Sequence, residues 1–135
     1  MTWTDVFFDT NVLVNLGSSD IAKSEATRSL LVEGGVVSVQ VLNEYVSVTR
    51  GKYRLPWVTV QIGFDGIRAA CIVVPVTVAV HERGLAYTER YKLAIYDSMI
   101  VAAAVLSGCT TLYSEDMHHG MVIDGLTIRN PYAVV

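Results

Sequence analysis

Short apolar runs alternate with segments of helical periodicity along most of the chain. Over 19–33, Ala22, Ala26 and Leu30 recur every fourth residue before a Gly-Gly pair, which predicts a helix and its end. Similar patterns predict helices that begin near 40 and 56 or span 77–91 and 97–106. Apolar and β-branched runs predict strands at 6–9, 36–39, 72–76, 110–113 and 126–129. Strands alternating with helices indicate a three-layer α/β/α fold with a largely parallel sheet of four to five strands.

Composition agrees with that architecture. The 135 residues are enough for one domain, 1–135, and 52% of them are hydrophobic while 17% are charged. This excess of apolar residues fits a sheet with helices on both faces and leaves apolar surface for a partner chain. No apolar run approaches the roughly 18 residues that cross a bilayer, so no membrane is expected as a partner.

The cysteines and the N-terminus bear on the compartment. Cys71 and Cys109 each precede a predicted strand and are expected to be small buried residues rather than a disulfide or zinc ligands. Residues 1–5 carry no basic side chain, so no signal peptide is predicted. A reducing cytoplasm is therefore the expected location.

An acidic residue interrupts the first apolar run. Asp9 follows Val6-Phe7-Phe8 and precedes Thr10 and Asn11, with more apolar residues beyond. Burial of a carboxylate is costly unless it is paired or binds a metal. In an open α/β sheet this position is the carboxyl end of a parallel strand, where ligands bind. The alternative is that Asp9 caps a helix beginning at Thr10, because Asp is a favoured N-cap.

Three further acids occupy related positions in the predicted fold. Glu44 lies in the second turn of the helix after the second strand, Asp97 starts an almost wholly apolar helix, and Asp116 follows the fourth strand. Taken singly, Glu44 is explained as solvent-facing and Asp97 as a helix cap. However, the carboxyl ends of parallel strands share one edge of the sheet, and the helix before the fourth strand begins at that edge. All four acids are therefore expected to meet there.

Carboxylates gathered in this way predict a metal site. They cannot all stay ionised unaided, because like charges raise one another's pKa. A hard divalent cation removes the repulsion, and ligands that are all oxygen favour Mg²⁺ or Mn²⁺ over zinc. Such an ion keeps positions open for phosphate oxygens and activates water, which suits phosphodiester hydrolysis. The net charge of −3 does not exclude RNA if four acids are committed to metal.

At these residues the chain resembles the PIN-domain family, and in particular the VapC-type ribonuclease toxins of bacterial toxin–antitoxin pairs. The matching motifs are Asp9-Thr10-Asn11, Glu44, Asp97 with the small-residue helix 100–104, and Ser114-Glu115-Asp116. Each motif alone is weak, whereas all four in this order and at this chain length are fairly specific. The match covers nearly the full length, and the acidic pattern is intact.

The resemblance implies a Mg²⁺-dependent endoribonuclease, with Mn²⁺ as a substitute, that cuts structured RNA such as tRNA or rRNA. It also implies a homodimer that a cognate antitoxin neutralises. The acids that would bind the metal and act in catalysis are Asp9, Glu44, Asp97 and Asp116. Ser114, with Thr10 or Asn11, would orient the carboxylates or a water. Glu115 is expected to point away, and His118-His119 are assigned no catalytic role.

Two segments are candidate binding surfaces. The loop 50–54 is expected to break the preceding helix and either grips phosphate and stacks a base or is a solvated turn. Its RNA-binding candidates are Arg50, Lys52, Tyr53 and Arg54. On the next helix, Trp57, Val60 and Phe64 are spaced i, i+3 and i+7. This stripe is either core or a groove for a partner chain.

Other classes fit less well. The sequence has no Gly-rich phosphate loop and no Ser-His-Asp or Cys-His signature. An aspartyl-phosphate phosphatase needs a second acid where Asn11 stands, and a receiver domain needs a lysine where 129–131 read Arg-Asn-Pro. The remaining alternative is a non-catalytic module that binds RNA or a partner protein. Four acids count against it, because RNA binding gains nothing from concentrated negative charge.

Overall fold

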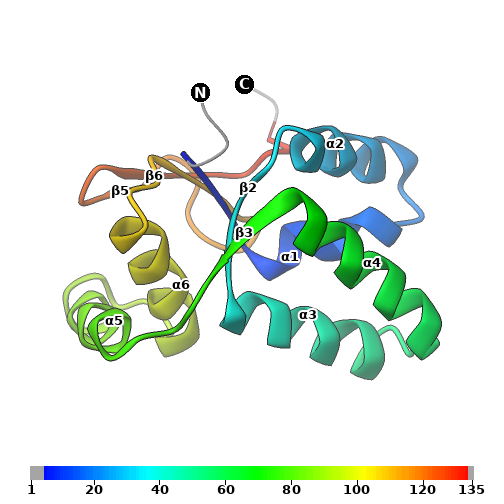
Figure 1. Ribbon diagram of the computed structural model, residues 1–135. Helices are drawn as coiled ribbons and strands as arrows, with labels where there is room; N and C mark the ends of the chain where they lie inside the picture. Colours follow the sequence, from blue (N-terminus) through cyan, green and yellow to red (C-terminus); the bar gives the residue numbers. More distant parts are fainter. Residues whose placement is uncertain (1–4, 134–135) are drawn as a thin grey trace.

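A six-stranded sheet forms the centre of the computed structural model, which describes residues 5–133 (Figure 1). The strand order is β3-β2-β1-β4-β6-β5, and all neighbours are parallel except β5 and β6. The strands are β1 (Val6–Phe8), β2 (Gly35–Ser38), β3 (Cys71–Val74), β4 (Thr111–Tyr113), β5 (Val122–Ile123) and β6 (Leu126–Arg129). The predicted α/β class is confirmed, with one more strand than the expected upper count.

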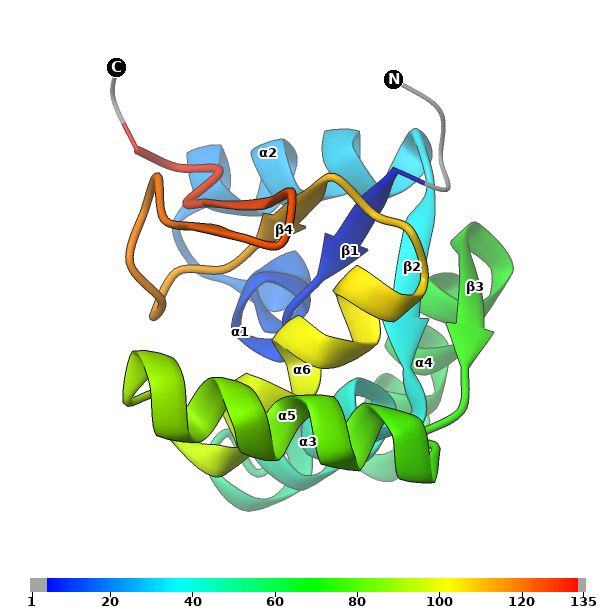
Figure 2. The same cartoon turned by 90° about the vertical axis from the view of Figure 1, so that its left-hand side faces the viewer.

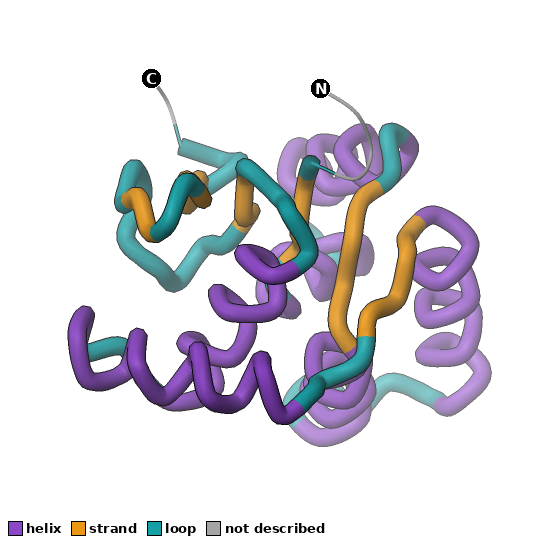
Figure 3. The backbone as a smooth tube through the Cα atoms, turned by 60° about the vertical axis from the view of Figure 1, so that its left-hand side comes forward, coloured by secondary structure: helices purple, strands orange, loops and turns teal. Residues whose placement is uncertain are grey.

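Helices cover both faces of this sheet. They are α1 (Thr10–Leu13), α2 (Ile21–Val32), α3 (Val39–Gly51), α4 (Trp57–Ala70), α5 (Val78–Tyr91) and α6 (Ile95–Leu106), with a 3₁₀ turn η1 (Val14–Gly17) after α1. Helices α5 and α6 lie on one side and α2 and α4 on the other (Figures 1 and 2), and Figure 3 shows α5 crossing α6. Helices α1 and α3 follow directly from the ends of β1 and β2. The carboxyl edge of the sheet is therefore lined by the starts of helices.

The core explains the apolar composition of α6. Residues 98–104 are buried without exception, because α6 lies between the sheet and α5. The strands β1 and β2 are buried along their whole length, as expected for a parallel sheet covered on both faces. Cys71 and Cys109 are both buried, as the sequence predicts. Within residues 5–133, no helix has the length and hydrophobicity to span a membrane.

The sequence prediction missed strand β5. It pairs with β6 through a tight turn in which Asp124 and Gly125 both have positive φ, 48° and 84°. An Asp-Gly pair supports this conformation, which matches the right-handed twist of a hairpin. The turn is attached to α5 because the Tyr87 hydroxyl donates to Asp124 Oδ2 at 2.5 Å.

Candidate functional site

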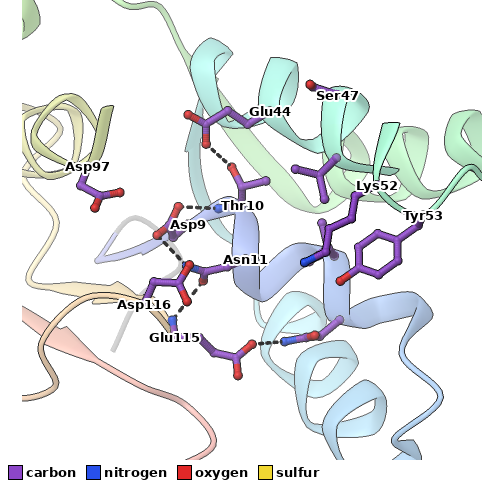
Figure 4. A pocket seen from close by; sticks show the side chains of 13 residues that line it. Asp9, Thr10, Asn11, Glu44, Ser47, Lys52, Tyr53, Asp97, Glu115 and Asp116 are labelled. Carbon is purple, nitrogen blue, oxygen red and sulfur yellow. Dashed lines mark hydrogen bonds between the residues drawn. The ribbon is translucent and has the colours of Figure 1, made fainter. Parts of the chain in front are cut away.

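The four predicted acids line one pocket of about 410 Å³ (Figure 4). Asp9 follows β1 and Asp116 lies three residues beyond β4; β1 and β4 are paired in parallel with Phe8 opposite Tyr113. Glu44 lies in the second turn of α3 and Asp97 in the first turn of α6. The topology thus brings together acids that are up to 107 positions apart. Their roles in binding metal and in catalysis stay predictions.

Asp9 is the most buried of these acids, with 4% of its surface exposed. Its Oδ1 accepts a hydrogen bond from the Thr10 backbone N–H at 2.7 Å, so Asp9, which directly follows β1, is the N-cap of α1. Its Oδ2 accepts from Ser114 Oγ at 2.8 Å and from Asn11 Nδ2 at 3.1 Å. Burial raises the pKa of Asp9 to about 6, and repulsion from Asp97 and Glu44 adds to the rise, which the hydrogen bonds only partly offset.

Glu44 is half-buried and held by two neighbours. The Thr10 hydroxyl donates to Glu44 Oε2 at 2.9 Å, and Gln40 Nε2 donates to Oε1 at 3.0 Å. Gln40 Nε2 also donates to the Tyr96 carbonyl oxygen at 3.0 Å, which connects α3 to the first turn of α6. Glu44 therefore faces the pocket and is fixed there, rather than extending freely into solvent.

Asp97 and Asp116 differ from Asp9 and Glu44 in their hydrogen bonding. Within residues 5–133, neither carboxylate accepts a hydrogen bond. Helix α6 begins at Ile95 with Ala94 as its N-cap, so Asp97 lies in the first turn but does not cap the helix. Burial raises the pKa of Asp97, as does repulsion from Glu44 and Asp116. These two acids keep their oxygens available to a ligand.

A fifth acid at the rim is neutralised by its neighbours. Glu115 forms an ion pair with Lys23, with Nζ 2.7 Å from Oε2, and its Oε1 accepts from Asn15 Nδ2 at 2.6 Å. Its backbone N–H donates to Asn11 Oδ1 at 3.0 Å. Glu115 is thus held by α2 and η1 instead of by the other acids. Lys23 and Asn15 were missed because no local pattern links them to a residue about a hundred positions away.

The structure separates the four RNA-binding candidates. Lys52 and Tyr53 line the acid pocket, and Lys52 is the one basic side chain among the described lining residues. Arg50 instead donates to the Leu55 carbonyl oxygen at 3.1 Å and lies 5.8 Å from the Trp57 ring centre. Arg54 is exposed and does not line the pocket. Arg50 and Gly51 also belong to α3, so the expected helix break comes later, at Lys52.

Comparison with known proteins places this arrangement in a family. The family model of the PIN domain matches residues 6–120. The chain belongs to the PIN-domain family. The VapC20 toxin of Mycobacterium tuberculosis, described as cleaving the sarcin–ricin loop, has a similar structure (TM-score 0.67, 19% identity, 82% of this chain and 89% of that one). So has a chain of a toxin–antitoxin complex from Klebsiella pneumoniae (TM-score 0.71, 24% identity, 96% and 99% covered). No curated protein matches the sequence.

The chemistry of this PIN domain's pocket fits a hard cation that keeps part of its water shell. The four acids offer only oxygen donors, which magnesium prefers, and no histidine or cysteine lines the pocket among the described residues. Across 5–133, no three Asp, Glu, His or Cys side chains are grouped closely enough to hold one ion directly. Magnesium commonly retains several waters, which bridge such gaps.

A second hollow of the PIN domain, of about 590 Å³, adjoins the acid pocket and shares Val14, Asn15 and Tyr53 with it. The predicted stripe on α4 does not line it: Val60 is 1% exposed and belongs to the core, whereas Trp57 is 55% exposed and Phe64 is half-buried. The stripe is thus divided, and for Val60 the core alternative holds. The residues that line the hollow, which the sequence did not single out, include Leu16, Tyr45, Leu55, Thr59, Ile62 and Gly63.

Proposed function

We propose that this PIN domain is an endoribonuclease that requires a divalent cation, Mg²⁺ with Mn²⁺ as a substitute. The observation that carries the proposal is a buried Asp9 with a pKa of about 6, in one pocket with three more carboxylates. So much negative charge opposes folding unless a cation compensates it. A non-catalytic module that binds RNA would be better served by a neutral or basic pocket.

Each acid would have a distinct part in this reaction. Asp9 and Glu44, fixed by hydrogen bonds, would hold the cation in one place. Asp97 and Asp116, whose oxygens are available, would complete its ligands directly or through water. When bound, the cation would lower the pKa of a water and offset charge on the leaving oxygen. Lys52 would bind a non-bridging phosphate oxygen at the mouth of the pocket.

The proposed substrate is structured RNA of the tRNA or rRNA class, and the proposed type is a VapC-like toxin that acts in the cytoplasm. The fold shared with a toxin that cleaves the sarcin–ricin loop supports this class. Tyr53, 51% exposed beside Lys52, offers a ring on which an unpaired base would stack.

We also propose a cognate antitoxin as a partner. The hollow of about 590 Å³ beside the acid pocket has a mainly apolar lining that includes Leu16, Leu55 and Ile62. Ile62 is 70% exposed, as expected of an apolar residue that a partner chain covers on binding. The likeness to a chain of a toxin–antitoxin complex supports this partner. A homodimer is proposed on the further exposed apolar residues of α5, Val78 and Leu85.

Cleavage of total tRNA and rRNA by purified protein tests the nuclease. We expect cutting with Mg²⁺, none with a chelator, and none by Asp9→Asn or Asp116→Asn. Glu115→Gln is the matched control, because the neighbouring Glu115 is engaged by Lys23 and should leave cleavage intact. If the protein binds RNA but cuts none with any divalent cation tested, the non-catalytic module is favoured. Unchanged cutting by both Asp variants would exclude the proposed site.

A further inference from the structure

A shallow hollow of about 420 Å³ lies between α3 and the start of α6. Its lining residues are Gln40, Asn43, Glu44, Ser47 and Tyr96. Glu44 and Ser47 line both this hollow and the acid pocket, and Figure 4 shows them one turn apart on α3. The hollow therefore adjoins the acid pocket. Its volume falls in the range of small-molecule sites, about 300–1,000 Å³.

Tyr96 forms one wall of this hollow. It directly precedes Asp97 and is 67% exposed, so its ring contributes little to the core. Its main chain is nevertheless fixed, because its carbonyl oxygen accepts from Gln40, which also donates to Glu44. An exposed aromatic ring on a fixed backbone beside a charged site is suited to stacking against a flat ligand.

Asn43 and Ser47 supply polar groups on the opposite wall. They are four residues apart and lie on the same face of α3 as Glu44. Within residues 5–133, neither side chain makes a hydrogen bond, so the amide and the hydroxyl are available. An amide presents a donor and an acceptor together, the pairing that reads the edge of a nucleobase.

The charge of the hollow indicates which part of a nucleotide, the phosphate or the base, would bind there. Its described lining has no basic side chain, and it includes the acidic side chain of Glu44. A phosphate would be repelled there, whereas a neutral base would not. The base must also be unpaired, because in a duplex its faces are stacked and its edge is occupied.

We propose that this hollow binds one unpaired nucleobase next to the scissile phosphate, with the base stacked on Tyr96 and its edge read by Asn43 and Ser47. The inference rests on the proposed nuclease, since the neighbouring phosphate is scissile only if the four acids cut RNA. It makes this hollow a determinant of the cleavage sequence.

The test uses RNA stem-loops that carry one cleavage site mapped in total tRNA and rRNA, randomised at each unpaired position around the cut, with Mg²⁺ and sequencing of the products. We expect Tyr96→Ala to raise KM by about 5- to 160-fold, the range of one stacked base, and Tyr96→Phe to stay near wild type. Asn43→Ala should flatten the base preference at one position on one side of the cut. Val122→Ala, an exposed change on β5, is the control.

A second measurement separates binding from cutting. Fluorescence anisotropy of the same RNA with Asp116→Asn protein should show weaker binding when Tyr96→Ala is added. If wild-type protein cuts no RNA, the nuclease proposal fails and this site with it. If wild type cuts and the Tyr96 and Asn43 variants keep its KM and base preference, only the base site is wrong. A change of oligomeric state in Tyr96→Ala, with base preference retained, would instead assign the hollow to a second copy of the chain.

Discussion

The acid pocket has two unlike halves. In one half, every carboxylate oxygen of Asp9 and Glu44 accepts a hydrogen bond from Thr10, Asn11, Ser114 or Gln40. In the other half, the described chain gives Asp97 and Asp116 no such bond. The first half is held in place by these bonds, while the second would be able to adjust to the proposed cation and its waters. In the proposed site, the first half would therefore fix where the metal binds, and the second would leave the completion of its ligand shell free.

The largest effect on cleavage is expected from removing a carboxylate charge in either half of the pocket. Asp9→Asn and Asp116→Asn should each lower the cleavage rate by about a thousandfold or more, because several kcal/mol of charge stabilisation are lost. Single-turnover cleavage of a labelled RNA measures this. If one variant retained wild-type rates, its half of the pocket would have no part in the chemistry.

The two halves should differ most clearly in stability without metal. The pKa of Asp9 is about 6 in the folded protein, against 3.8 in an unfolded chain, so the folded state holds the proton more tightly. Stability should therefore fall as pH rises from about 4 to 6, and the full cost at pH 7 is about 3 kcal/mol.

Urea unfolding in a chelator, from pH 4 to 7.5, measures this loss. Asp9→Asn should remove most of it and be more stable than wild type at pH 7. Asp116→Asn should change stability by no more than about 0.5 kcal/mol, because Asp116 is exposed. Equal pH profiles for wild type and Asp9→Asn would contradict the burial argument.

The hydrogen bonds of the fixed half can be tested one at a time. Ser114→Ala removes a donor to Asp9 Oδ2. It should raise the Mg²⁺ concentration needed for half-maximal cleavage by about 10- to 100-fold. A Mg²⁺ titration of the cleavage rate measures it. Ser29→Ala, on the exposed face of α2, is the control. A titration indistinguishable from wild type would mean that Asp9 needs no support from Ser114.

The smallest effect is expected at the rim. Lys23→Met breaks the ion pair with Glu115, but both side chains are partly exposed. Surface ion pairs contribute little, so cleavage should stay within about threefold of wild type. A large gain or loss of activity would show that Glu115 enters the pocket when released, and would make it a fifth member of the adjustable half.

Sequence reasoning predicted the backbone of this site better than its side-chain contacts. Strand ends and helix starts follow from apolar runs, so the shared edge for Asp9, Glu44, Asp97 and Asp116 could be worked out from topology. The contacts of Glu115 with Lys23 and Asn15 could not, since they depend on where α2 packs. The predicted helices 77–91 and 97–106 leave Tyr96 in the connection between them, and only the packing of α6 against α3 through Gln40 gives it a neighbour.

The missed hairpin had a usable signal. Val122-Ile123 and Leu126-Thr127 flank Asp124-Gly125, and an Asp-Gly pair between apolar residues is a strong short-range hairpin pattern. For the stripe on α4, in contrast, the sequence has no pattern that decides which residues are buried. Helical spacing puts Trp57, Val60 and Phe64 near one another, but only the angle of α4 on the sheet decides which of them is buried.

The brevity of β5 also limits how copies of the molecule can associate. Continuing a sheet from one chain into another requires a row of unpaired peptide groups along the outermost strand. Strand β5 has only two residues, and its turn is anchored to α5 by Tyr87. It therefore offers an incoming strand very few peptide groups for hydrogen bonding. Growth into fibrils by pairing at that edge of the sheet is therefore disfavoured.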